Sequence, residues 1–251
     1  MKLRILAACA VAGLLLAGFV SAAGPALPKF EPDPYWPKHL PNHWMLGQVS
    51  GVAVDSHDHI WIIHRPRTTE AHDNYLRDKT ADCCQPAPPV MEFDQEGNLV
   101  QSWGGPGQGY DWPDIEHGIF VDHNDNVWLA GNGAKDTNLL KFSKSGKFLL
   151  QIGKHGETGG SNDTKNVNQS AGMSVYAPTN EVFVADGYGN RRVIVFDADT
   201  GAYKRHWGRT AISRTTGRRR RGSMKAPALR SSTRCMELRC PRTAWSTSAI
   251  G

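Results

Sequence analysis

The sequence predicts an all-β protein, an incomplete β-propeller of about three four-stranded blades. The first observation behind this prediction is that residues 116–153 read as two hairpins: GIFVD turns at HNDN and returns as VWLA, and LLKF turns at SKSG and returns as FLLQI. The second is that this unit recurs on both sides at a period of roughly 40 to 50 residues, as radial repeats do. The third is that the second hairpins end alike, in Trp103-Gly104, Ile152-Gly153 and Trp207-Gly208.

The other two blades follow the same order of hairpins. Residues 51–63 (GVAVDSHDHIWII) and 90–104 (VMEFDQEGNLVQSWG) form the first blade, and residues 173–185 (MSVYAPTNEVFVA) and 193–208 (VIVFDADTGAYKRHWG) form the third. No segment has a convincing helical pattern. Because one such sheet cannot bury both of its faces, each blade must stack on a neighbour. We therefore expect residues 47–208 to form a partial propeller whose two end blades expose sheet faces and edges.

An export signal and an extended lead-in precede the blades. In residues 1–23, Lys2 and Arg4 come before an apolar run that ends in small residues, as in a secretory signal peptide. Residues 24–46 are rich in proline and aromatic side chains, which favours extended chain. No other apolar run is long enough to span a bilayer. The sequence thus predicts a secreted or periplasmic protein with no membrane span after the signal is removed.

Residues 209–251 break the repeat pattern. They contain ten Arg and one Lys against one Glu, a net charge of +10, so the rest of the +5 chain carries −5. Reading the codons of Cys235-Met236-Glu237 from their third base gives His or Tyr followed by Gly, the same opening as in residues 117–118. We therefore expect this tail to be out of frame and disordered. For the same reason we expect no nucleic-acid partner, although the tail is basic.

The directions of the strands predict where a site lies. The turn after each first strand lies at one end of a blade, so residues just before first strands and just after second strands meet at the other end. His117 opens a first strand, while His64, Arg65 and Tyr188 close second strands. The insertion of residues 66–89 leaves from the same end, and long loops on a rigid scaffold typically carry function. We expect a peptide or small-molecule ligand on this looped face.

Two other groups of residues have alternative interpretations. Residues 55–59 and 122–126 carry Asp, Asn and His as metal sites do, but Asp and Asn also favour such turns for backbone reasons. Neither segment has the glycine and distal glutamate of a calcium loop, so we interpret both as hairpin turns. Cys83 and Cys84 could form a vicinal disulfide or link two chains in an oxidising compartment. A zinc site is disfavoured there because adjacent cysteines lack the usual spacing.

The repeats GVAVDSHDHIWIIHR and VFVADGYGNRRVIVFD resemble the NHL repeats of six-bladed propellers. Within that family, GQVSGVAVDSHDHIWIIHR, EHGIFVDHNDNVW and EVFVADGYGNRRVIVF resemble the peptidyl-α-hydroxyglycine α-amidating lyases and their bacterial relatives, over residues 47–208. Those lyases cleave a peptidyl-hydroxyglycine to a peptide amide and glyoxylate, with a zinc ion held by three histidines. The resemblance implies that His117 is a zinc ligand and that Arg65 and Tyr188 are catalytic residues.

The same resemblance implies that this chain is incomplete. The lyases carry a cysteine where this chain has Gly189, and their other two zinc-binding histidines belong to later blades, one in the shifted tail and one beyond the chain. Because one histidine cannot hold a catalytic zinc ion, we expect the chain as it stands to be inactive. The alternative is a non-catalytic exported propeller that binds a protein or glycan through its looped face, with residues 66–89 as the contact.

Overall fold

The computed structural model of the protein describes residues 27–72 and 83–208. It divides the chain into two units, Met1–Tyr35 and Trp36–Gly251. The described part of the first unit, residues 27–35, contains no strand or helix. The predicted signal peptide of residues 1–23 and the predicted out-of-frame tail of residues 209–251 lie outside the described residues.

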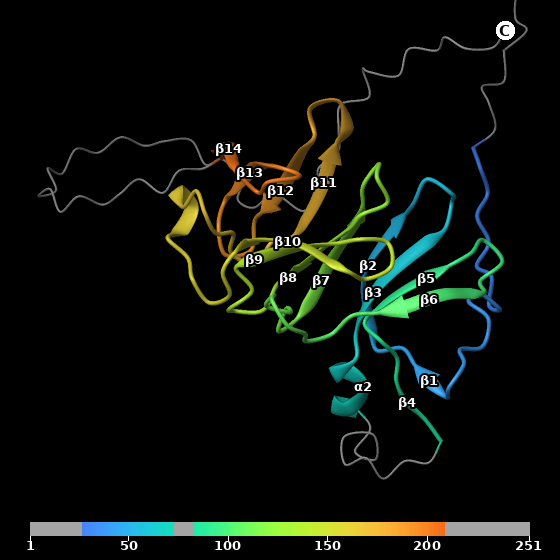
Figure 1. Ribbon diagram of the computed structural model, residues 1–251. Helices are drawn as coiled ribbons and strands as arrows, with labels where there is room; N and C mark the ends of the chain where they lie inside the picture. Colours follow the sequence, from blue (N-terminus) through green and yellow to red (C-terminus); the bar gives the residue numbers. More distant parts are fainter. Residues whose placement is uncertain (1–26, 73–82, 209–251) are drawn as a thin grey trace, which may run out of the picture. The chain divides into compact units, whose positions relative to one another are not determined.

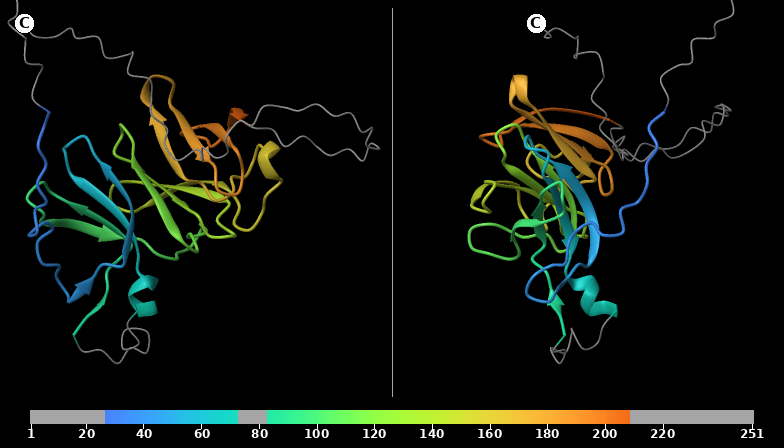
Figure 2. Two further views of the ribbon diagram at one scale, coloured as in Figure 1. Left: turned by 180° about the vertical axis from the view of Figure 1, so that it is seen from behind. Right: turned by 90° about the vertical axis from the view of Figure 1, so that its right-hand side faces the viewer.

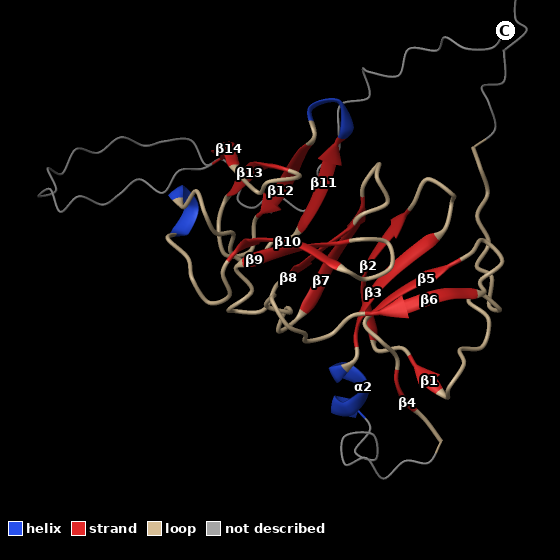
Figure 3. Cartoon of the chain, viewed as in Figure 1, coloured by secondary structure: helices blue, strands red, loops and turns tan. Residues whose placement is uncertain are grey.

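The described residues of the second unit form three four-stranded antiparallel sheets, each with its strands in chain order (Figures 1 and 3). The strands of the first blade are β2 (Gln48–Val54), β3 (Ile60–Arg65), β5 (Val90–Phe93) and β6 (Leu99–Trp103). Those of the second are β7 (Glu116–Val121), β8 (Val127–Gly131), β9 (Asn138–Phe142) and β10 (Phe148–Gly153). Those of the third are β11 (Gly172–Tyr176), β12 (Glu181–Asp186), β13 (Arg192–Asp197) and β14 (Tyr203–Gly208). The prediction of an incomplete all-β propeller with three blades is confirmed.

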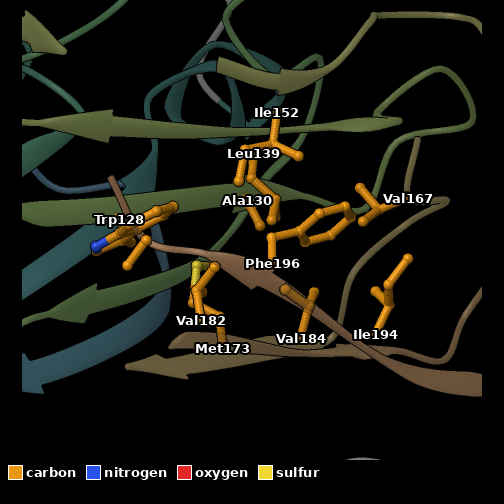
Figure 4. Packing of buried hydrophobic residues seen from close by; sticks show 11 residues of the cluster. Trp128, Ala130, Leu139, Ile152, Val167, Met173, Val182, Val184, Ile194 and Phe196 are labelled. Atoms are coloured by element: carbon orange, nitrogen blue, oxygen red, sulfur yellow. The ribbon is translucent and has the colours of Figure 1, made fainter. Parts of the chain in front are cut away.

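Apolar side chains are buried between neighbouring blades. The second blade lies between the other two (Figure 2), and every residue of its strand β8 is buried. Because side chains alternate across a strand, Val127 and Leu129 pack toward the first blade while Trp128 and Ala130 pack toward the third. Figure 4 shows the cluster between the second and third blades, which contains Trp128, Ala130, Leu139, Ile152, Val167, Met173, Val182, Val184, Ile194 and Phe196.

The inner strands of the first and second blades approach closely, and this contact requires a glycine. A Cβ atom on Gly51 of β2 would lie 2.9 Å from the backbone oxygen of His117 in β7, closer than real Cβ contacts allow. The backbone oxygen of His117 belongs to a strand and cannot move away as the end of a flexible side chain can. Gly51 therefore brings the start of β7 against β2 and sets the position of His117.

The part of the lead-in from residue 36 onward covers part of the outer face of the first blade. Its strand β1 (Trp44–Met45) pairs in parallel with β4 (Gln85–Pro86) at the end of the insertion. The ring of Trp36 packs against Phe93 with centroids 5.6 Å apart. Beside this cover, Val52 and Val54 of β2 are 65% and 57% exposed, and Trp207 on the third blade is 49% exposed. Apolar side chains on both end blades are therefore exposed, as expected.

The insertion contains a short helix, α2 (Arg67–His72), so the expectation of a helix-free chain was wrong. Its sequence, RTTEAH, includes good helix formers, but six residues are too few for a helical period to appear in the sequence. Two 3₁₀ turns also occur, Gly160–Asn162 and Ala177–Thr179. Cys83 and Cys84 are joined to each other by a disulfide. In the part of the chain that the structure describes, no helix has the length and hydropathy of a membrane span.

Candidate functional site

The structure brings Arg65, His117 and Tyr188 together from three places in the chain. Arg65 ends β3, His117 lies in β7, and Tyr188 lies in the loop after β12. An Nη atom of Arg65 lies 3.5 Å from Nδ1 of His117. The rings of His117 and Tyr188 meet edge to face, with centroids 5.3 Å apart. A cation, an imidazole and a phenol thus lie side by side on the looped face.

Backbone geometry and a backbone contact set the positions of the His117 and Arg65 side chains. The pairing of β7 with β8 shifts register between Glu116 and Gly118, so a β-bulge at His117 re-aims its side chain. Nε of Arg65 donates a 2.8 Å hydrogen bond to the backbone oxygen of Glu116, which holds the guanidinium beside the bulge. A second Nη contact reaches the side-chain oxygen of Asn132 at 3.4 Å. Sequence reasoning did not select Asn132, although it follows β8 at the same end of the blade.

Tyr188 is carried by a loop that a buried ion pair holds in place. The carboxylate of Asp186, which is fully buried, accepts hydrogen bonds from Nε of Arg192 (2.9 Å) and from the side-chain amide of Asn190 (2.8 Å). A Cβ atom on Gly189 would lie 2.3 Å from the side chain of Asn168. A side chain at this position, such as the cysteine that the resemblance to the amidating lyases implies, would therefore require Asn168 to move.

The electrostatic surroundings of His117 favour its neutral form. Burial lowers the pKa of the imidazole, and the nearby positive charge of Arg65 lowers it further. A neutral imidazole can accept a hydrogen bond or bind a metal ion, whereas an imidazolium can do neither.

His64, which was expected at the same end of the blade, faces a different environment. It is fully buried, its Nδ1 accepts the backbone N–H of Gly47 (3.1 Å), and its Nε2 donates to the backbone oxygen of Pro88 (2.9 Å). Burial lowers the pKa of this imidazole as well. Both ring nitrogens are used in joining Gly47, just before β2, to Pro88 near the end of the insertion, so His64 does not join the group of Arg65.

The Asp-rich turns are built as hairpin turns. One oxygen of Asp55 accepts the backbone N–H groups of His57 and His59, both at 2.9 Å. Asp122 makes the equivalent bonds to the N–H groups of Asn124 and Asn126, also at 2.9 Å. These bonds support the hairpin-turn interpretation.

Three groups of described side chains could hold a metal ion, and none includes His117. Their members are Asp55, His57 and Asp125; Asp55, His59 and Glu92; and Asp114, Asp136 and His155. The described residues around His117 therefore do not fit the three-histidine zinc site of the amidating lyases.

A pocket of about 620 Å³ opens beside the insertion. Its walls include Pro66 and Glu116, the chain neighbours of Arg65 and His117, together with Trp112, Asp114 and His155. Sequence analysis missed Asp114 and His155, but strand direction could have found them. Asp114 precedes the first strand of the second blade and His155 follows its fourth strand, so both lie at the looped end.

Comparisons with known proteins point to the amidating lyases. The chain is 26% identical over 165 residues to the probable peptidyl-alpha-hydroxyglycine alpha-amidating lyase pgal-1 of Caenorhabditis elegans, which covers 61% of this chain and 42% of that protein. It is 28% identical over 192 residues to the peptidylglycine alpha-amidating monooxygenase of Rattus norvegicus, covering 71% and 19%. It is 28% identical over 158 residues to the peptidyl-alpha-hydroxyglycine alpha-amidating lyase 2 of Drosophila melanogaster, covering 61% and 37%.

These homologues confirm the resemblance to the amidating lyases, and the chain spans less than half the length of each of them. No family model matches the chain. Among solved structures, BamB from Moraxella catarrhalis has 14% identity and a TM-score of 0.38, covering 68% of this chain and 40% of that one. The Pan2 WD40 domain of Neurospora crassa has 15% identity and a TM-score of 0.38, covering 64% and 38%. The propeller assignment rests on the three four-stranded sheets themselves.

Proposed function

We propose that this chain is part of an exported propeller whose complete form cleaves peptidyl-α-hydroxyglycine to a peptide amide and glyoxylate. The observation that carries the proposal is the meeting of Arg65, His117 and Tyr188 at one end of the blades. The homologues named as amidating lyases support the same reaction class. This chain spans 42% and 37% of the length of those two homologues, so the proposed activity is that of the complete protein.

The three side chains suit the parts of that reaction. The substrate ends in a carboxylate, and a guanidinium binds a carboxylate through two parallel hydrogen bonds. Tyr188 is 37% exposed, so its phenol is open to a ligand, and in the ionised form it would accept the proton of the substrate hydroxyl. As that proton leaves, the C–O bond becomes the carbonyl of glyoxylate, the C–N bond breaks, and the amide nitrogen takes up a proton. Neutral His117 would hold the reacting end between Arg65 and Tyr188.

The proposed reaction involves a zinc ion only in the complete protein and not in this chain alone. Because the described residues do not supply a zinc site around His117, we propose that this chain alone does not catalyse the cleavage. Recognition of the substrate carboxylate by Arg65 needs no metal, so binding tests the proposal on this chain directly.

The test compares two peptides that differ only at the C-terminus, one ending in a glycine carboxylate and the other in a glycine amide. Calorimetry with the full chain should show tighter binding of the carboxylate form. Arg65→Gln should weaken that binding by about 1.5 to 3 kcal/mol, the usual contribution of a charged hydrogen bond, and should leave binding of the amide form unchanged. Equal binding of the two forms by the unsubstituted chain would rule the proposal out.

The pocket beside the insertion favours a second candidate, a non-catalytic exported propeller that binds a protein or glycan. Proline and aromatic side chains form much of the pocket wall, among them Pro86, Pro88, Tyr110 and Trp112. Aromatic residues supply binding energy at recognition surfaces. Under this candidate, Trp112→Ala abolishes ligand binding while Arg65→Gln does not.

A further inference from the structure

The second blade carries another group of chemically active side chains, separate from Arg65, His117 and Tyr188. Asp114 precedes β7, Asp136 lies between β8 and β9, and His155 follows β10. All three positions lie at the looped end of the blade because its strands alternate in direction. Asp114 and His155 line the pocket, and Asp136 is only 1% exposed.

The imidazole of His155 stands between the two carboxylates. Its Nε2 lies 3.5 Å from Oδ2 of Asp114, and its Nδ1 lies 3.8 Å from Oδ1 of Asp136. One ligand atom from each of the three residues lies within 4.8 Å of the other two. Ligands about 2.0 to 2.2 Å from one ion lie up to about 4 Å apart. The two carboxylates approach different ring nitrogens, so the Asp114 side chain, which is 47% exposed, has to turn toward Nδ1 for one ion to contact all three residues.

The histidine also has an unsatisfied atom that points to a ligand. Nδ1 of His155 is buried and has no hydrogen-bond partner in residues 27–72 and 83–208. The 3.8 Å separation from Asp136 is too long for a hydrogen bond. Leaving a buried polar atom without a partner is unfavourable, and folded proteins satisfy such atoms through protein, water or an ion.

Asp136 cannot turn to meet that nitrogen, because the backbone holds its carboxylate. It accepts the N–H groups of Asp114 (2.7 Å), Ile115 (3.1 Å) and Gly133 (2.6 Å). A metal ion between Asp136 and His155 satisfies Nδ1 without moving the carboxylate, since a carboxylate oxygen that accepts one N–H keeps a lone pair for an ion.

The two other candidate metal-binding groups both contain Asp55, which already has a protein cation beside it. At Asp55 and Glu92, Nζ of Lys144 lies 2.9 Å from one carboxylate and 3.0 Å from the other, so a protein cation already balances their charges. Among the described residues, the ion pairs of Asp114 and Asp136 are with His155 alone. The charge of a divalent ion is therefore better accommodated at His155.

We propose that Asp114, Asp136 and His155 bind a divalent first-row transition-metal ion, with zinc as the best match, in the wall of the pocket. One imidazole nitrogen and two carboxylate oxygens are ligands that zinc accepts, and the two carboxylates balance its charge. Three protein ligands leave a coordination position open toward the pocket for water or for an oxygen of a bound ligand. This site does not depend on the proposed lyase function.

The test is a zinc titration of the full, metal-stripped chain in competition with a chromophoric chelator. One equivalent of zinc should bind. His155→Ala and Asp114→Asn should each weaken this binding by more than about 100-fold, since even the loss of a residue that only supports a ligand costs about 10- to 100-fold. His117→Ala is the matched control and should retain the equivalent of zinc. Replacing zinc with cobalt should give an absorption spectrum that His155→Ala abolishes.

Asp136 is left unchanged in this test because its loss would release three backbone N–H groups. If His155→Ala disturbs folding, as judged by thermal unfolding, Asp114→Asn decides, because that side chain is half exposed and its carboxylate accepts no backbone N–H within the described part of the chain. The proposal is overturned if the unsubstituted chain binds no zinc, if Asp114→Asn binds zinc as tightly as the unsubstituted chain, or if only His117→Ala removes the ion.

Discussion

His64 and His117 show how surroundings separate two histidines at the same end of the blades. Burial lowers the pKa of both rings, and Arg65 lowers that of His117 further, so the neutral form of both rings is favoured. His64 uses both nitrogens in bonds to the backbone, while His117 faces Arg65 and Tyr188. The first therefore stabilises the fold, and the second is available for a ligand.

The lowered pKa of His64 predicts a loss of stability in acid. Its pKa in the folded protein lies below its ordinary value of 6.5, so the unfolded chain binds more protons below that pH. The free energy of unfolding should therefore fall as the pH drops below about 6.5. Protonation of Nδ1 also removes the acceptor of the Gly47 N–H, at a cost of about 1 to 3 kcal/mol.

Urea unfolding at pH 7.5 and 5.5 measures this effect. His64→Gln should be less stable than the parent at pH 7.5 and should lose less stability on acidification. His123→Gln, in an exposed turn, is the control and should keep the parent's pH dependence. An equal loss in His64→Gln and the parent would contradict the assignment.

At the scale of the element, the loop after β12 depends on one buried ion pair. Nε of Arg192 donates to Asp186, while its Nη atoms donate to the backbone oxygens of Ser161, Asp163 and Asn166. This arginine thus ties the loop of Tyr188 to the connection between the second and third blades. The position of Tyr188 follows from these contacts.

Asp186→Asn should destabilise the protein by about 3 kcal/mol, because it leaves the charge of Arg192 buried without its counter-ion. Asp58→Asn is a matched control at an exposed turn with φ of 60°, a conformation that asparagine tolerates, and should change stability by less than about 0.5 kcal/mol. Chemical denaturation of both variants checks the difference. Similar stabilities would show that the ion pair does not hold the loop.

At the scale of the whole molecule, the two end blades expose apolar side chains that a neighbouring blade would cover. Val52 and Val54 on the first blade and Trp207 on the third are about half exposed or more. Every face between the described blades, by contrast, is packed with buried side chains. Each sheet therefore buries its apolar side chains where it packs against another described blade, and exposes them where it does not.

The proposed out-of-frame origin of residues 209–251 predicts a particular gene sequence. Correcting the frame near codon 209 should restore a blade opening with His or Tyr followed by Gly at the position of residues 235–237, and further blades after it. Sequencing the gene across codons 205 to 251 and the bases that follow is the measurement. No open reading frame in either alternative frame would contradict the proposal.

The repeats predicted the structure because each strand carries its own signal. Alternation of apolar residues marked the strands, Asp, Asn and Gly marked the turns, and the order of hairpins marked the blades. The same logic of strand direction placed Arg65, His117 and Tyr188 at one end, and the structure brings these three together. Their roles stay predictions. Helix α2 was missed because its six residues carry no readable period.

The sequence by itself determined the fold class, the number of blades and the end at which a site lies, because these depend on local pattern and on strand direction. Only the tertiary structure decided which side chains at that end share a site. In the folded chain His64 is buried and bonded to the backbone, a β-bulge lies at His117, and Asp114, Asp136 and His155 lie together beside a pocket that Asp114 and His155 line. These outcomes depend on contacts between segments far apart in the chain, for which no local pattern exists.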